Sequence, residues 1–175
     1  MGPQQVNPSL ARVNQKLAYC RAILRLTAGE SAVPANANQR LEQQALLDAG
    51  AFHLMCAYRH YLQELAEHYG VPSSETIVTE QDLLKRLQNL DKEPVEAREL
   101  ERLRHETGSW LSSLQAAYDV CWQPAPKPSI QRRIQVVDLD SPQGGKRRVT
   151  RESLGSWLQS MESLIDHQRE IGAEY

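Results

Sequence analysis

Residues 38–69 read NQRLEQQALLDAGAFHLMCAYRHYLQELAEHY, and Gly70 follows them. At a rise of about 1.5 Å per residue, one unbroken helix over this stretch is about 48 Å long. Its apolar arc consists of Leu41, Ala45, Leu47, Ala51, Phe52, Met55, Cys56, Tyr58, Leu62, Leu65, Ala66 and Tyr69. This arc spans more than half of the helix circumference, which is wider than an ordinary surface stripe. The helix therefore needs partners on two sides, and we expect it at the centre of a helical bundle.

The flanking sequence supplies the packing partners for this helix. Apolar residues repeat in steps of three and four over residues 8–28 and again over 94–122, which is typical of bundle helices. A short helix begins after Thr79, and a last helix follows Thr150. We therefore predict an all-α, up-and-down bundle of four long helices plus one short helix. It forms a single domain over residues 1–175, with residues 1–6 as a loose tail.

Gly50 and the segment 123–149 interrupt this regular pattern. Gly50 costs about 1 kcal/mol in a helix interior, and either a close helix crossing or a kink would explain it. Residues 123–128 are rich in proline and should be extended. Residues 130–139 resemble a strand and a turn follows at 141–145, so the segment is either a small β-hairpin between the third and last long helices or a disordered basic loop.

Composition places the chain among soluble proteins, with 41% hydrophobic and 24% charged residues. The three cysteines are widely spaced and fall on apolar helix sides, which favours buried, reduced thiols. The N-terminus lacks the pattern of a signal peptide, and no apolar run reaches the ~20 residues of a membrane span. We expect a cytoplasmic protein without a membrane segment.

Motifs for catalysis or metal binding are weak, so we predict no catalytic residue, no metal site and no cofactor. His53, His60, Glu64 and Glu67 share one face of the central helix, but it is the polar face opposite the apolar arc. The spacing from Arg98 to His105 is similar to that of toxin-type helical RNases, yet charged helices produce such spacings by chance. An RNase-like or metal-dependent enzyme is thus a remote alternative.

Arg59 is the charged residue that most needs an explanation, because it falls inside the apolar arc. A buried charge requires a partner, and Asp48 is about 16 Å away along the helix. The partner is either another helix or a ligand. Asn14 and Arg21 lie at the edge of the first seam. If they converge on Arg59, the three residues form a candidate binding pocket for an anionic ligand.

The net charge of −2 is unevenly distributed along the chain. Residues 127–151 carry a net charge of +5, which leaves −7 for the remainder. Clustered guanidinium groups attract phosphate, although the acidic remainder would repel nucleic acid. The candidate residues for contact with a partner or nucleic acid are Arg132, Arg133, Lys146, Arg147 and Arg148.

Two stretches resemble a known family. Residues 12–17 read RVNQKL, and the central helix contains AFHL at 51–54 and ELAEHY at 64–69. The first is similar to the R-x-N-Q-K-L opening of a family of small bacterial α-helical proteins known only as a domain of unknown function. The resemblance implies a cytoplasmic, mostly helical protein and supplies no activity.

Taken together, these observations favour a non-catalytic helical-bundle protein that acts through protein–protein interaction, either with another protein or as a homodimer. The alternative is a binding module for an anionic ligand or nucleic acid, which would use Arg59, Arg21 and the basic segment at 127–151.

Overall fold

The computed structural model describes residues 8–28, 34–122 and 148–173. Within these residues the protein forms α-helices and one short 3-10 turn, and no strand. The elements are α1 (Pro8–Leu26), α2 (Ala37–His68), η2 (Ser74–Thr76), α3 (Glu80–Gln88), α4 (Val95–His105), α5 (Trp110–Val120) and α6 (Arg151–Ala173). The predicted all-α class is confirmed.

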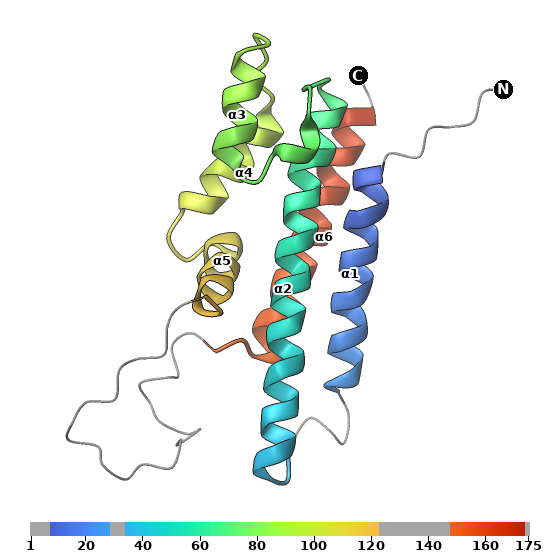
Figure 1. Ribbon diagram of the computed structural model, residues 1–175, viewed down its shortest axis with the longest axis vertical. Coiled ribbons are helices and arrows are strands. Elements are labelled where there is room, and N and C mark those ends of the chain that lie inside the picture. The colour runs from blue at the N-terminus through green and yellow to red at the C-terminus, as the bar shows by residue number, and fades with distance from the viewer. Residues whose placement is uncertain (1–7, 29–33, 123–147, 174–175) are drawn as a thin grey trace, which may run out of the picture.

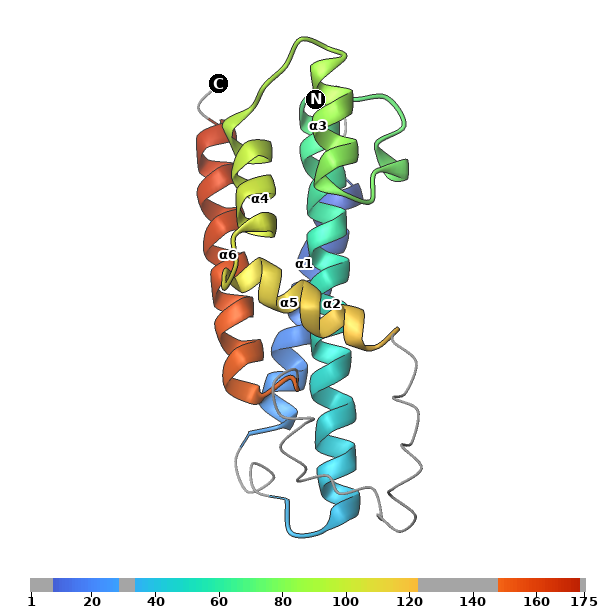
Figure 2. The same ribbon diagram turned by 90° about the vertical axis from the view of Figure 1, so that its left-hand side faces the viewer.

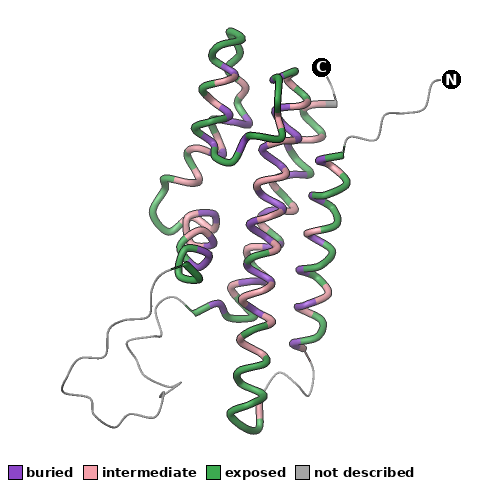
Figure 3. Tube along the Cα trace, in the orientation of Figure 1, coloured by how far each residue is buried: buried purple, intermediate pink, exposed green. Residues whose placement is uncertain are grey.

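The long helix α2 occupies the centre of the molecule, as its wide apolar arc predicts. It packs against α1, α3, α5 and α6. Helices α1, α2 and α6 run side by side, and the shorter helices α3, α4 and α5 lie on the opposite side of α2 from α1 (Figures 1 and 2). Buried residues line the inner faces of these helices, whereas the N-terminal turns of α2 are largely exposed (Figure 3).

Polar side chains begin three of the helices, and two of these caps, Thr79 and Thr150, stand where the sequence predicts a helix start. The side chain of Asn36 accepts a hydrogen bond from the backbone N–H of Gln39 at 2.9 Å. Thr79 caps α3 by accepting from the backbone of Asp82, and Thr150 caps α6. Each cap satisfies a backbone donor that the first helical turn leaves unpaired.

Gly50 marks a close crossing of α2 and α6. A Cβ atom at this position would lie 2.5 Å from Cδ2 of Leu154 and 3.5 Å from Cγ2 of Ile23. Because Leu154 is fully buried, it has little room to move away. Of the two explanations for this glycine, the close crossing is therefore the correct one.

The predicted buried arc of α2 is only partly correct. Leu41 and Phe52 were assigned to it but are 63% and 43% exposed. Leu54, Ala57 and Tyr61 were not, yet they are completely or almost completely buried. With partners on several sides, α2 buries more of its circumference than one arc describes, while its N-terminal turns extend beyond those partners.

The predicted third long helix, residues 94–122, is wrong in one respect. It is broken into α4 and α5 at a turn in which Gly108 has a φ of +85°, so the count of four long helices plus one short helix is also wrong. Thr107, which lies in the middle of this stretch, is exposed. Leu103 and Trp110 are seven residues apart, so the apolar spacing continues across the break and conceals it.

Three further expectations concern the cysteines, the predicted hairpin and membrane-spanning helices. Cys20 is buried, but Cys56 is half-buried and Cys121 is exposed, so the prediction of three buried thiols is wrong. Residues 123–147, which include most of the predicted hairpin, lie outside the described residues; the described residues 148–150 form no strand. Among the described helices, none is both long and apolar enough to span a membrane.

Candidate functional site

Five aromatic and imidazole rings form a continuous row across α1, α2 and the end of α5. Tyr19 of α1 lies 5.2 Å from His53, measured between ring centroids. His53 lies 5.8 Å from its neighbour Phe52, and Phe52 lies 6.1 Å from Tyr118 of α5. Tyr118 contacts Trp122 at 6.0 Å. We call these five residues the aromatic row.

Much of the aromatic row is open to solvent. Tyr19, Phe52 and Trp122 are 44%, 43% and 71% exposed, whereas Tyr118 is buried beneath them. Phe52 follows Gly50 by two residues, or about 200° around the helix. Since Gly50 faces α6, Phe52 points away from α6, to the side of α2 that lies between α1 and α5. The row is thus an exposed apolar surface on a helix that is otherwise central.

Two cationic side chains flank the aromatic row. The ammonium group of Lys16 lies 5.5 Å from the centroid of the Tyr19 ring, and the guanidinium carbon of Arg59 lies 5.4 Å from that of Tyr118. Neither forms an ion pair with another residue in the described part of the chain. Each cation is held over the negative face of a ring and remains available to a carboxylate.

These cations affect the titratable groups beside them. Burial lowers the pKa of His53, and the charge of Lys16 lowers it further. Burial raises the pKa of the Cys56 thiol, and the charges of Lys16 and Arg59 partly oppose that change. The Nδ1 atom of His53 is buried and has no hydrogen-bond partner among the described residues. The centre of the row is therefore neutral at physiological pH and bordered by positive charge.

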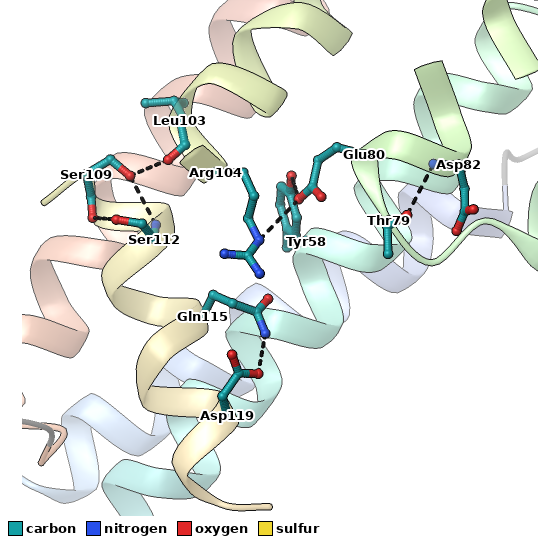
Figure 4. A network of polar contacts seen from close by, with 10 residues as sticks. All are labelled: Tyr58, Thr79, Glu80, Asp82, Leu103, Arg104, Ser109, Ser112, Gln115 and Asp119. Atoms are coloured by element: carbon teal, nitrogen blue, oxygen red, sulfur yellow. Dashed lines mark hydrogen bonds and ion pairs between the residues drawn. The ribbon is translucent and has the colours of Figure 1, made fainter. Parts of the chain in front are cut away.

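The turn between α4 and α5 sets the position of Tyr118 and Trp122. The hydroxyl of Ser109 donates to the backbone carbonyl of Leu103 and accepts from the backbone of Ser112 at 3.0 Å, which caps α5 (Figure 4). Together with the left-handed backbone of Gly108, these bonds redirect the chain so that α5 crosses α2 (Figure 2).

A buried polar cluster ties α3 and α4 to α2. The Tyr58 hydroxyl donates to Glu80, and Arg104 lies 4.0 Å from the same carboxylate (Figure 4). Burial raises the pKa of Tyr58, and the adjacent Glu80 raises it further. Tyr58 and Glu80 are both nearly inaccessible to solvent. The cluster therefore has a structural role, since it holds α3 and α4 against α2.

The three predicted ligand residues have different partners. Arg21 forms an ion pair with Glu162 at 2.6 Å, and the amide oxygen of Asn14 accepts from Arg169 at 3.3 Å. Both partners belong to α6, whereas Arg59 lies over a ring of α5. These contacts give no support to a shared anion pocket. The partner that Arg59 requires is an aromatic ring and not a carboxylate.

Glu64 was assigned to the solvated polar face, and this assignment is wrong. It is 7% exposed, and both its oxygens accept from Arg169 at 2.8 Å. Arg169 is 105 residues away in the sequence, so local periodicity could not identify the pair. Among the described residues, no group of three or more histidine, cysteine, aspartate or glutamate side chains is placed to hold a metal ion.

The remaining candidates lie apart from the aromatic row. Arg98 forms an exposed ion pair with Glu93, and His105 is exposed at the end of α4. Arg148 is exposed and makes a polar or electrostatic contact. The other predicted contact residues, Arg132, Arg133, Lys146 and Arg147, lie outside the described residues.

Sequence reasoning missed the aromatic row as a unit. Only the spacing of Tyr118 and Trp122, four residues apart near the end of a helix, was visible in the sequence. The contacts of Phe52 with Tyr118 and of His53 with Tyr19 join separate helices, and neither follows from local spacing.

Comparison with known proteins identifies a family but no activity. Residues 8–175 match the model of a family of unknown function, DUF6586. The match confirms the expectation of an uncharacterised family. No curated protein and no solved structure matches the chain.

Proposed function

This chain belongs to the family of unknown function DUF6586, and we propose that it is a non-catalytic module whose aromatic row binds a partner protein. The observation that carries this proposal is the row itself, in which three rings are exposed and two cations flank them. Tyrosine, tryptophan, phenylalanine and arginine are the residues enriched at protein interfaces, where tryptophan, tyrosine and arginine also supply most hot spots.

The charges beside the row indicate the chemistry of the partner. Lys16 and Arg59 form no ion pair among the described residues, so both can pair with carboxylates of a partner. The exposed rings of Phe52 and Trp122 would pack against aliphatic side chains. The partner surface is therefore apolar at its centre and acidic at its edges, as in an acidic amphipathic helix.

A second copy of this chain fits the row less well than a different protein does. A twofold contact places the same patch on itself, and would bring two copies of Lys16 and Arg59 together. The row contains no carboxylate to offset them. Nucleic acid is also a weaker fit, because the formal charge outside residues 127–151 is −7.

The proposal is tested by photo-cross-linking in the native cell. Benzoylphenylalanine replaces Phe52 or Trp122 in two variants, and replaces Val95 in a matched control, since Val95 is 77% exposed on α4. We expect both row positions to cross-link the same protein and the control to leave it unlinked. The cross-linked segment should carry several carboxylates.

Three outcomes of this experiment would overturn the proposal. Equal cross-linking from all three positions would indicate a non-specific surface. Adducts with nucleic acid alone would favour the alternative module for nucleic acid. Adducts with a second copy of the chain alone would assign the row to a homodimer.

We propose that the protein binds this partner in the cytoplasm. The cysteines Cys20, Cys56 and Cys121 are all unpaired thiols, which a reducing compartment maintains. Fractionation of native cells tests this expectation, and recovery of the protein with an oxidising compartment would contradict it.

A further inference from the structure

A second feature of the molecule, a pocket remote from the aromatic row, lies between the C-terminal parts of α2 and α6. Its volume is about 410 Å³, and it is also lined by Leu10 of α1 and Glu96 of α4. Pockets that bind small molecules have volumes of about 300–1,000 Å³. The pocket is thus large enough for a small organic ligand.

Polar contacts between α1, α2 and α6 hold the walls of this pocket. Glu64 of α2 is paired through both oxygens with Arg169 of α6, and Asn14 of α1 accepts from that same guanidinium group. Because these side chains are already fixed by one another, the walls are pre-organised, and a ligand would not have to order them.

The Tyr61–Gln168 contact adds a second fixed polar wall. The Tyr61 hydroxyl donates to the side-chain oxygen of Gln168 at 2.6 Å, and the Gln168 amide donates to Glu99 of α4 at 2.8 Å. Both Tyr61 and Gln168 are almost fully buried.

The formal charge of the lining is negative. Glu64, Glu67 and Glu96 supply three carboxylates against the single guanidinium group of Arg169, which gives a formal charge of −2 with His68 neutral. The pKa values of two phenol groups nearby are raised by burial and, in addition, by these carboxylates. The pKa of Tyr61 is raised by burial and by Glu64, and that of Tyr69 is raised to about 12 by burial and by Glu96.

The arrangement of these charges selects a cation over an anion. An anion that approached Arg169 would have to displace Glu64 from two charge-assisted hydrogen bonds. Glu67 accepts from Ser9 and Ser74 through one oxygen, Oε1, and Glu96 accepts from Tyr69. A carboxylate has about four lone-pair sites, so both retain capacity for a further donor.

The apolar part of the lining indicates an organic cation with a hydrocarbon chain. The side chains of Leu10 and Leu65 line the same pocket as the carboxylates. A strongly hydrated metal ion would gain nothing from these walls, whereas methylene groups would be removed from water against them. We propose that the pocket binds a linear aliphatic amine whose ammonium groups pair with Glu67 and Glu96 and whose methylene chain packs on Leu10 and Leu65.

Isothermal titration calorimetry on the full-length protein tests this site with defined probes. The probes are 1,5-diaminopentane and spermidine, with the neutral 1,5-pentanediol, the dianion glutarate and Mg²⁺ as comparisons. We expect the Kd of at least one amine to be tenfold or more below that of every comparison compound. Equal affinity for the diol, for glutarate or for Mg²⁺, or no amine binding, would overturn the assignment.

Three variants locate the binding to the pocket. Glu67→Gln and Glu96→Gln keep an acceptor oxygen for the present hydrogen-bond partners and remove one charge each. Gly172→Leu fills the pocket, since a Cβ atom there lies 3.6 Å from Nε2 of His68, an ordinary contact. Each variant should weaken amine binding tenfold or more.

The matched control for these variants is Glu170→Gln, which removes an exposed carboxylate from the same helix as Gly172. It should bind the amine as the unmodified protein does. If Glu170→Gln weakens binding as much as Glu96→Gln does, or if Gly172→Leu leaves binding unchanged, the amine is held by surface charge alone and the pocket is not its site.

Discussion

The aromatic row and the Glu64–Arg169 region both include residues of the central helix, α2, and they have opposite character. In the row, large apolar rings are exposed and the flanking cations have no ion-pair partner in the described chain. In the other region, the Glu64 carboxylate is buried and both its oxygens accept from Arg169. Each is an exception to the usual division of apolar inside and charged outside. The difference suggests that the aromatic row needs a partner from outside the chain, whereas Glu64 and Arg169 are paired with each other.

If the Glu64–Arg169 pair is satisfied internally, breaking it should give the largest loss of stability. Arg169→Met leaves the nearly buried Glu64 without its two hydrogen bonds. We expect the free energy of unfolding to fall by about 3 kcal/mol, the low end for a buried pair because Arg169 is partly exposed. Urea denaturation measures this loss.

The double variant Glu64→Gln with Arg169→Met is the control for that loss. It removes the unpaired charge, and so should recover part of the stability. A single Arg169→Met variant as stable as the unmodified protein would mean that the pair is not structurally coupled, and the contrast between the two regions would be lost.

Thiol reactivity distinguishes the buried core from the end of the row. Burial raises the pKa of Cys20 to about 12, whereas Cys121 is exposed beside Trp122. Iodoacetamide should therefore alkylate Cys20 on the order of a hundredfold more slowly than Cys121. Mass spectrometry of the labelled peptides gives both rates. Similar rates would place Cys20 within reach of solvent.

The close crossing at Gly50, on the side of α2 that faces away from Phe52, is tested by adding a side chain there. Gly50→Val would force a side chain against Leu154 and should destabilise the protein by about 2 kcal/mol, as overpacking does. Thermal denaturation checks this value. Adding Leu154→Ala should restore part of the loss, and a second substitution that only adds to the damage would argue against direct contact.

The smallest effect concerns pH. The pKa of His53 is lowered in the folded protein from 6.5, first by burial and then by Lys16. Between the folded pKa and 6.5 the unfolded chain binds more protons, so stability rises with pH in this window and is lost as pH falls through it. His53→Phe should remove this contribution. Urea denaturation of both proteins from pH 7 to pH 5 measures it, and parallel curves would contradict the expectation.

The sequence predicted those parts of the fold that local patterns determine. The caps at Thr79 and Thr150 followed from residue chemistry, whereas at Gly50 the sequence left a close crossing and a kink as alternatives and the contact with Leu154 decided between them. The break at Gly108 did not follow from the sequence, because the apolar spacing of Leu103 and Trp110 continues through it.

The candidate site was harder to predict because long-range contacts create it. A glutamate on a helical wheel suggests a solvated face, and only Arg169, 105 residues away, makes Glu64 a buried group. Phe52 suggests a core residue, yet it packs on Tyr118 of α5 and is still 43% exposed. Arg59 stands out in the sequence as a charge that needs a partner from another helix or from a ligand, but local spacing does not identify that partner as the ring of Tyr118.

The most direct test of the central claim is the affinity of the purified protein for the partner identified by cross-linking. Trp122→Ala removes the most exposed ring of the row and should raise the Kd tenfold or more, as loss of an interface hot spot does. Its free energy of unfolding should stay within about 0.5 kcal/mol of the original value. Val95→Ser should change neither quantity. An unchanged Kd for Trp122→Ala, with the partner bound normally, would contradict the account.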